Sequence, residues 1–179
     1  MSRRLALALV FIAAMVVGHV GTIVAAPHAI MAVAMNRLSQ SGEAVNRFHF
    51  ARRTTAQSRA IVRPSPDLAY ASCVYDLADG PLLVTAAPTP AKGYVSVSVF
   101  AGNTDNIGVF DSLRAPEGIR FVLAPAGQVP DPAKMPTGLP VLYSPSRKGV
   151  ILDRRLAPTA EAFAVADKAR REDRCAPLR

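Results

Sequence analysis

The first hydrophobic segment of the chain covers residues 5–26 and contains no formally charged residue. As an α-helix it would be about 33 Å long, slightly more than the roughly 30 Å hydrocarbon core of a bilayer. Arg3 and Arg4 precede it, as basic residues do in both signal anchors and cleavable signal peptides. The small residues at 24–26 are typical of a cleavage site, but the length of the segment and the proline that follows favour an uncleaved anchor. The pattern therefore predicts a transmembrane signal anchor over residues 1–27.

A shorter apolar pattern follows Pro27, which suits the first turn of a new helix. Ile30, Met31 and Met35 recur at helical spacing, so we expect a short helix that lies along the membrane interface or prolongs the span. The following residues, up to 61, are polar and basic with little periodicity. Residues 28–61 are therefore predicted to form a juxtamembrane amphipathic and basic linker.

From residue 62 onward the apolar residues form short runs between prolines and glycines. Thirteen prolines lie between Pro64 and Pro158, which excludes long helices there. Residues 94–100 alternate valine with serine, the pattern of a half-buried strand. Further strands are predicted at residues 68–77, 82–86, 107–110, 120–124, 141–143 and 149–152. The pattern indicates a mainly β domain over residues 62–179, an antiparallel β-sandwich or jelly-roll-like fold.

One helix is predicted after the last of these strands. Residues 160–171 are rich in helix formers, and Thr159 stands in the N-cap position. Glu161 in the first turn and basic residues in the last turn suit the helix dipole. Phe163 and Ala166 would then face the sheet.

Positive charge is concentrated next to the apolar segment. Residues 28–63 hold six arginines and one glutamate, whereas residues 64–179 hold thirteen basic and twelve acidic residues. A nearly neutral domain argues against nucleic-acid binding, which needs a basic face on the folded part. Arginines beside a membrane span suit anionic lipid headgroups, although a solvated basic linker fits the same pattern.

The charges on each side of the apolar segment predict its orientation. Two arginines and the terminal amine precede it, whereas the nearest basic residue beyond it is Arg37. The positive-inside rule then places the N-terminus in the cytoplasm. The arginines of residues 47–63 act in the opposite direction from farther away. We expect a single-pass protein of the inner (cytoplasmic) membrane with its domain in the periplasm.

The chain offers few residues for catalysis or metal binding. Its two cysteines, Cys73 and Cys175, could form a disulfide in an oxidising compartment, or could be a buried thiol and a free thiol. With two distant cysteines and no histidine after His49, neither a zinc site nor a histidine-dependent nucleophile is expected. No nucleotide-binding or HExxH motif is present, and no metal or cofactor is expected.

Aspartates are the remaining candidates for catalytic chemistry in the domain. Five lie near predicted turns: Asp67, Asp76, Asp79, Asp105 and Asp111. A pair among them could serve glycoside hydrolysis, but aspartate is common at turns for conformational reasons. The oxygen-rich residues 103–106 lack the spacing of a calcium loop.

Several ordered motifs of the domain resemble a known family. They are RPSPDLAY at 63–70, VYDLADGP at 74–81, YVSVS at 94–98, NTDN at 103–106, and SPSR at 144–147 followed by an arginine at 154 or 155. Together they resemble the family called domain of unknown function 1254 over roughly residues 62–170.

The resemblance implies a β-rich fold and no particular reaction. In long members of the family this domain precedes a second one, domain of unknown function 1214, and the present chain is similar to a short, membrane-anchored version without it. A separately encoded partner carrying the second domain is therefore implied. If the domain has a polar pocket, the matched motifs supply its candidate ligand-binding residues: Arg63, Asp67, Tyr70, Asn103, Asn106 and Arg147.

We expect a membrane-anchored, extracytoplasmic binding or assembly module rather than an enzyme. The alternative is one half of a split cell-envelope enzyme whose active site forms only with the partner. A third possibility is a peripheral lipid-binding protein that uses residues 28–63. Carboxylates converging in one cleft would favour the enzyme, whereas an exposed apolar patch along one sheet would favour the assembly module.

Overall fold

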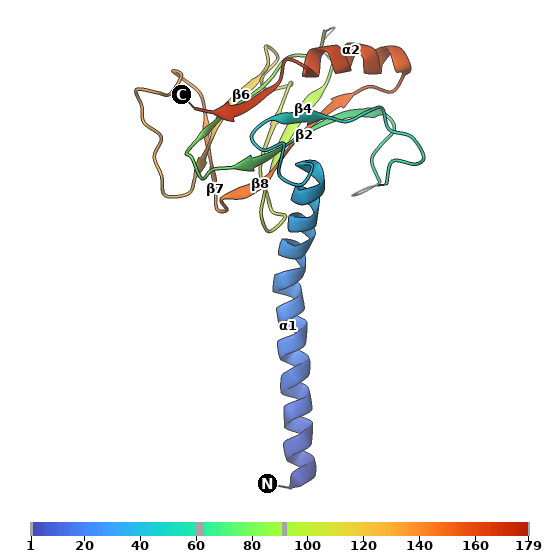
Figure 1. Ribbon diagram of the computed structural model, residues 1–179, viewed down its shortest axis with the longest axis vertical. Helices are drawn as coiled ribbons and strands as arrows, with labels where there is room; N and C mark the ends of the chain where they lie inside the picture. Colours follow the sequence, from blue (N-terminus) through green and yellow to red (C-terminus); the bar gives the residue numbers. More distant parts are fainter. Residues whose placement is uncertain (1, 60–62, 91–92, 179) are drawn as a thin grey trace.

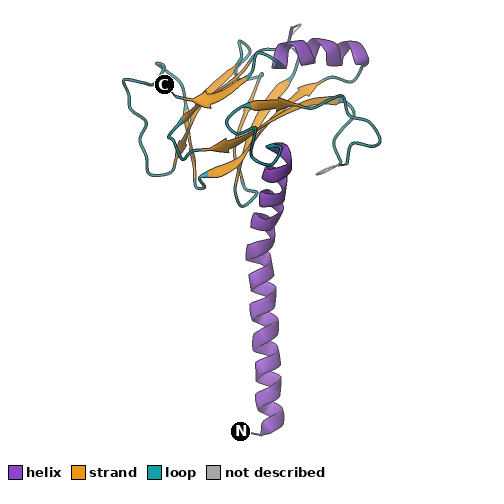
Figure 2. Ribbon diagram, in the orientation of Figure 1, coloured by secondary structure: helices purple, strands orange, loops and turns teal. Residues whose placement is uncertain are grey.

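The computed structural model describes residues 2–59, 63–90 and 93–178. A long N-terminal helix carries a mainly β domain at its C-terminal end (Figures 1 and 2). The elements are α1 (Arg3–Leu38), β1 (Phe48–Phe50), β2 (Leu68–Asp76), β3 (Leu82–Ala86), β4 (Val95–Ala101), β5 (Asn106–Asp111), β6 (Ile119–Pro125), β7 (Val141–Ser144), β8 (Lys148–Leu156), α2 (Ala160–Arg170) and β9 (Arg174–Pro177).

The described strands form two sheets, one in the order β1-β2-β8-β4-β5 and the other in the order β7-β6-β3-β9. The mainly β prediction is confirmed, and each predicted strand is present. A purely antiparallel arrangement is wrong at one pair, because β6 and β7 run parallel with Val122 opposite Val141. The connection over residues 126–140 is long enough to return the chain to the same end of the sheet, as a parallel pair requires.

The inward-facing residues of both sheets share one hydrophobic core. Val95, Val97 and Val99 alternate with serines along β4, and all three valines are buried. From the second sheet, Phe121 stacks on Phe110 of β5 with ring centroids 4.2 Å apart. The period-two pattern of the sequence thus marks the faces that meet.

α1 is one continuous helix with Pro27 inside it, so a separate second helix is not formed. Its last turns extend the apolar segment up to the domain. There Met31 packs against Val74 and Val150, on the face of the five-stranded sheet opposite the core. α1 is long and apolar enough to cross a membrane, a property that membrane anchors and signal sequences share.

A strand of the five-stranded sheet lies within residues 28–61, the segment predicted as a linker. β1 pairs with β2, and Phe48 packs against the core. Just before it, the Asn46 side chain accepts a hydrogen bond from Asp76 N (2.8 Å) and donates one to Asp76 O (2.9 Å). These bonds tie the segment after α1 to the end of β2. A three-residue strand is too short to produce a visible periodicity in the sequence.

The predicted C-terminal helix is confirmed as α2. Thr159 caps it, since its hydroxyl accepts a hydrogen bond from Ala162 N at 3.1 Å. Ala166 and Phe163 pack against Ala69 at the start of β2, as their spacing predicted. β9, which follows α2, was not predicted.

Candidate functional site

Two of the family-like motifs meet at one end of the five-stranded sheet. The Tyr75 hydroxyl lies 2.9 Å from Ser144 Oγ, and burial raises the pKa of this tyrosine. Arg147 donates to both carboxylate oxygens of Asp76, at 2.8 and 3.0 Å. This guanidinium holds the pKa of Asp76 well below its usual range. The contacts join β2 to the β7–β8 turn, so the motifs have a structural role here.

The six predicted ligand-binding residues do not form one pocket. Arg147 and the 103–106 loop lie at the Asp76 end of the sheet, where Gly102 N donates to Ser146 Oγ at 2.7 Å. Asn103 donates to Asp105 within its own loop at 2.6 Å. Asn106 begins β5, and its amide lies against the backbone of the same sheet.

The other three candidates lie toward the opposite end of β2. Arg63 and Asp67 are exposed. The Tyr70 hydroxyl accepts a hydrogen bond from Ser65 N at 2.9 Å, which fixes the local turn. Along β2, Tyr70 and Asp76 are six residue steps apart, or about 20 Å. The two groups therefore cannot hold one small ligand together.

A buried ionic cluster, which the sequence did not predict, surrounds Arg155 of β8. Its guanidinium donates to Asp153 (2.9 Å) and to both oxygens of Asp173 (2.8 and 3.0 Å). It also donates to Ala87 O (2.8 Å) and to the Thr89 hydroxyl (3.1 Å). The side chains of Arg155 and both aspartates are fully buried. The cluster links β8 to the segment after β3 and to the turn before β9.

Burial and the charge of the neighbouring Asp153 raise the pKa of Asp173 to about 7. Burial also raises the pKa of Asp153, one of whose oxygens is buried without a partner among the described residues. These are the carboxylates that the structure brings together, but no substrate can reach them. Their arrangement therefore argues for a structural role.

A second buried arginine, Arg170, fastens α2 to the five-stranded sheet. It donates to the carbonyls of Ala51 (2.6 Å) and Tyr70, and to the Asp167 carboxylate (2.8 Å). Its guanidinium lies 5.2 Å from the Phe163 ring. Like Arg155, it has a carboxylate partner inside the domain.

Arg154, the neighbour of Arg155, points to the other face of the same sheet. It stands in register with Tyr70 on one side and Ser96 on the other. Its single hydrogen bond within the described residues goes to Ser98 Oγ at 2.9 Å, and its Nε is buried without a partner. Over residues 2–59, 63–90 and 93–178 it forms no ion pair. A shallow cavity of about 200 Å³ lies beside it.

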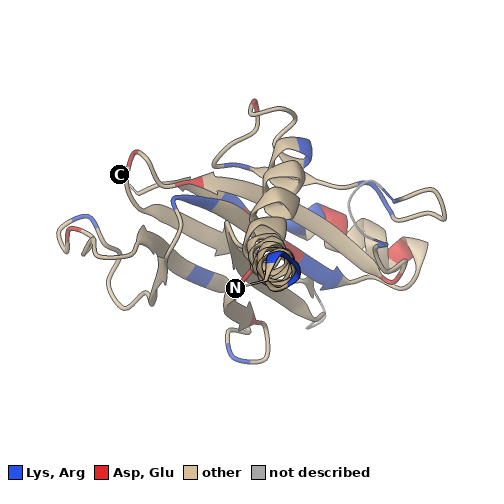
Figure 3. Ribbon diagram, turned by 90° about the horizontal axis from the view of Figure 1, so that it is seen from below, with Lys and Arg blue, Asp and Glu red and all other residues tan. Residues whose placement is uncertain are grey.

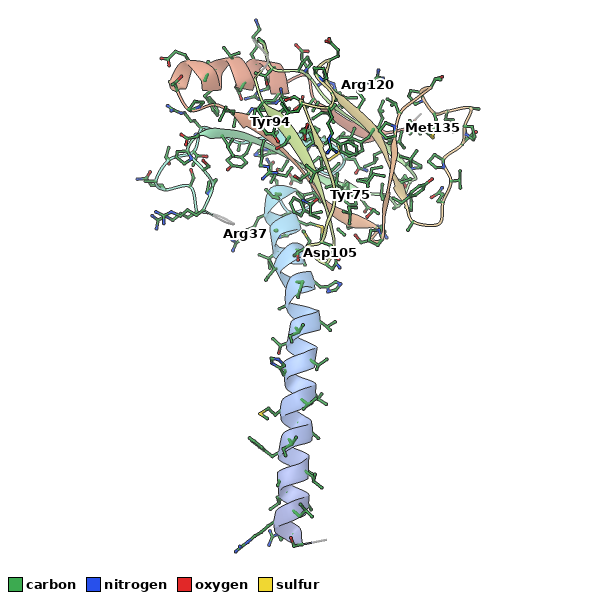
Figure 4. The ribbon with its side chains drawn as sticks, turned by 180° about the vertical axis from the view of Figure 1, so that it is seen from behind. Arg37, Tyr75, Tyr94, Asp105, Arg120 and Met135 are labelled. Carbon is green, nitrogen blue, oxygen red and sulfur yellow. A yellow bond between two sulfur atoms is a disulfide. The ribbon has the colours of Figure 1, made fainter. Side chains whose placement is uncertain are left out.

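Exposed apolar side chains surround this arginine. Tyr94 is 39% exposed, Leu156 50% and Val109 51%. We use the term open face for these three residues together with Leu68, Ser96 and Arg154. α1 packs on the same side of the sheet, and Figure 3, which looks along α1, shows the strands spread behind it. Figure 4 places Asp105 beside α1, whereas Arg120 lies on the far side of the domain.

An arginine at 154 or 155 was part of a family-like motif, but the predicted strand ended at residue 152, so the opposite orientations of Arg154 and Arg155 were not predicted. β8 continues to Leu156, and the alternation places Ile151, Asp153 and Arg155 inward. Three charged residues at the end of an apolar run gave no sign that two of them are buried. The sequence did contain one signal for this burial, because Ile151, Asp153 and Arg155 recur at every second position, the spacing of one face of a strand.

Cys73 of β2 and Cys175 of β9 form a disulfide, with Cα atoms 6.6 Å apart. It joins the two sheets and is buried in the core. Within the described residues, no group of three or more His, Cys, Asp or Glu side chains could hold a metal ion.

The sequence matches the family described as "Protein of unknown function (DUF1254)" over residues 45–177. The chain belongs to this family. The match starts close to β1. No functionally curated protein matches the chain.

Two solved structures are similar to the chain. The VPA0106 protein of Vibrio parahaemolyticus is 15% identical, with a TM-score of 0.64 over 86% of this chain and 36% of that protein. A putative uncharacterized protein from Burkholderia cenocepacia is also 15% identical, with a TM-score of 0.43 over 79% of this chain and 38% of that one. The chain therefore spans little more than a third of each, and the Vibrio likeness shows the fold alone.

Proposed function

We propose that the protein is a membrane-anchored, non-enzymatic assembly module that binds a partner chain through its open face. In this proposal α1 spans the inner membrane with its N-terminus in the cytoplasm, and the two sheets form a β-sandwich in the periplasm. The partner is a separate protein carrying the second domain, domain of unknown function 1214, that long family members have in the same chain.

The observation that carries the proposal is the exposed apolar patch on one sheet. Tyr94, Val109 and Leu156 lie around a central arginine, and each is at least 39% exposed. Protein interfaces are enriched in tyrosine and arginine at their centres, and a contiguous exposed apolar patch commonly marks an interaction site. The only carboxylates found to converge among the described residues, Asp153 and Asp173, are enclosed by the domain, which speaks against the split-enzyme alternative.

The length relationship supports the same conclusion. The Vibrio protein continues well beyond the part that this chain matches. In our proposal a separate chain supplies the structure that packs against the domain in such longer relatives. The disulfide suits an oxidising compartment, and the packing of α1 against the sheet would hold the open face at a fixed height above the membrane.

The test is co-purification of the full-length chain with the second-domain protein of the same organism from solubilised membranes. Leu156→Glu should abolish co-purification, because it places a charge in the apolar patch. Val165→Glu is the matched control, since Val165 is 45% exposed on α2, away from the open face. Equal recovery of the partner by both variants, with unchanged melting temperatures, would overturn the proposal.

Location needs a separate test. A single Val165→Cys variant supplies a free thiol while Cys73 and Cys175 remain bonded. A membrane-impermeant maleimide should label it in intact spheroplasts. Labelling only after lysis would place the domain in the cytoplasm and contradict the proposed orientation.

A further inference from the structure

We propose that Arg154 is the anchor point of the open face and that the partner presents an aspartate or glutamate carboxylate to it. This inference rests on the proposed function and specifies the chemistry of the partner. It commits to a protein side chain, rather than a lipid or a small metabolite, as the group that Arg154 binds.

The first argument is the missing counter-charge. Among the described residues, Arg155 and Arg170 are the two fully buried arginines, and each contacts at least one carboxylate. Arg154 is half-buried, yet no acidic side chain of the described residues lies within ion-pair distance. An arginine covered by a partner without an anion would lose hydration with no compensation, which is unfavourable.

The second argument is the number of unused donors. A guanidinium has five N–H groups in a planar fork, and Arg154 directs one hydrogen bond to Ser98. Its Nε is buried on the protein side, so the terminal nitrogens are the part left for a ligand. Two terminal nitrogens match the two oxygens of a carboxylate in bidentate geometry. Ser98 holds the guanidinium in place for such a contact.

The third argument is the size and lining of the space beside Arg154. The cavity of about 200 Å³ is lined by Leu68, Tyr94, Ser96 and Arg154. Small-molecule sites usually enclose roughly 300–1,000 Å³, so this space suits one protruding side chain better than a cofactor. Leu68 and Tyr94 provide apolar walls that exclude water around the ion pair, as in interface hot spots.

Position on the domain is consistent with a protein partner. Tyr94 lies away from Asp105 of the 103–106 loop, which lies beside α1 (Figure 4). Because α1 leaves from the same side of the sheet, a partner on the open face would sit on the membrane side of the domain, next to the anchor. Domain and partner would therefore meet close to the bilayer surface.

The experiment measures the affinity of the second-domain protein for the full-length chain in phosphatidylcholine nanodiscs. Arg154→Gln should weaken binding by about tenfold or more, the expected effect of losing a charge-assisted pair. Arg154→Lys should bind with an affinity between those of Arg154→Gln and the unmodified chain, because a lysine ammonium keeps the charge but lacks the planar guanidinium geometry. Arg120→Gln is the matched control, an exposed arginine on β6 of the other sheet, and should bind like the unmodified chain.

Arg154→Glu separates charge pairing from packing. If a carboxylate faces this position, like-charge repulsion should weaken binding further than Arg154→Gln does. Equal affinities of Arg154→Gln and the unmodified chain would overturn the inference. Equal affinities of Arg154→Glu and Arg154→Gln would overturn the claim that the partner presents a carboxylate at this position. Absence of binding by the unmodified chain would instead overturn the proposed function, and this inference with it. Unchanged melting temperatures of the variants show that the fold is intact.

Discussion

Arg154 and Arg155 are consecutive residues of one strand, yet their surroundings differ in every respect. Arg155 points into the domain, where two carboxylates, a carbonyl and a hydroxyl use its donors. Arg154 points outward to the open face, where its side chain makes one hydrogen bond within the described residues, to Ser98. The residue type is the same, and strand alternation alone decides which side each occupies. A satisfied, enclosed arginine stabilises the fold, whereas an unsatisfied one at an apolar surface is available for binding.

The largest expected difference between the two arginines is in stability. Arg155→Met leaves two buried carboxylates without their cation, which should lower the free energy of unfolding by about 3–5 kcal/mol. Arg154→Met removes one hydrogen bond and should cost about 1 kcal/mol or less. Urea denaturation of both full-length variants, followed by circular dichroism, measures the two values. Similar losses would show that the two positions are energetically alike and would break the comparison.

The disulfide provides the next largest effect, because it cross-links the same interior. Replacing Cys73 and Cys175 together by alanine should lower the free energy of unfolding by about 2–5 kcal/mol, since the loop spans about 100 residues. A reductant should produce the same loss in the unmodified chain and none in the double variant. If reductant leaves the free energy of unfolding of the unmodified chain unchanged, the prediction is contradicted.

The interior carboxylates should also make stability depend on pH. The pKa of Asp173 is raised from 3.8 to about 7 in the folded state, so folding favours its protonated form. Its contribution is therefore complete below pH 4 and is lost as the pH rises through 7, at no more than about 1.4 kcal/mol per pH unit. Denaturation at several pH values measures the slope, and Asp173→Asn should flatten it. A slope that persists in this variant would assign the titration to another group.

The exposed ion pair at Asp76 should show the smallest effect and the opposite sign. Arg147 lowers the pKa of Asp76, so the contribution of this carboxylate is present at neutral pH and lost below about pH 4. Asp76→Asn should lower the free energy of unfolding by about 1 kcal/mol or less, because solvent screens the pair. A loss as large as that of Arg155→Met would contradict the distinction between surface and interior ion pairs.

The ordered motifs that resemble the family also supplied the candidate ligand-binding residues, and the structure shows what some of the motif residues contact. Tyr75, Asp76 and Arg147 belong to matched segments, and the structure shows them bonded to one another or to Ser144 at the end of the sheet. Arg63 and Asp67 lie about a strand length away. In this chain the contacts of Tyr75, Asp76 and Arg147 are architectural.

The sequence by itself determined the apolar N-terminal helix, the strands β2 to β8, the capped C-terminal helix and the family, because each rests on local periodicity, turn residues or ordered motifs. It could not reveal the parallel β6–β7 pair or the addition of β1 to the sheet, since each depends on contacts between distant segments. It left open whether the helix after Pro27 is separate or prolongs the span, and α1 is continuous there. Only the tertiary structure decided that Arg155 meets Asp173 from beyond α2, whereas Arg154 has no carboxylate partner among the described residues. Alternation along β8 is a local signal for which of the two arginines faces inward, but the carboxylates that meet it there come from distant parts of the chain and are brought together only by folding.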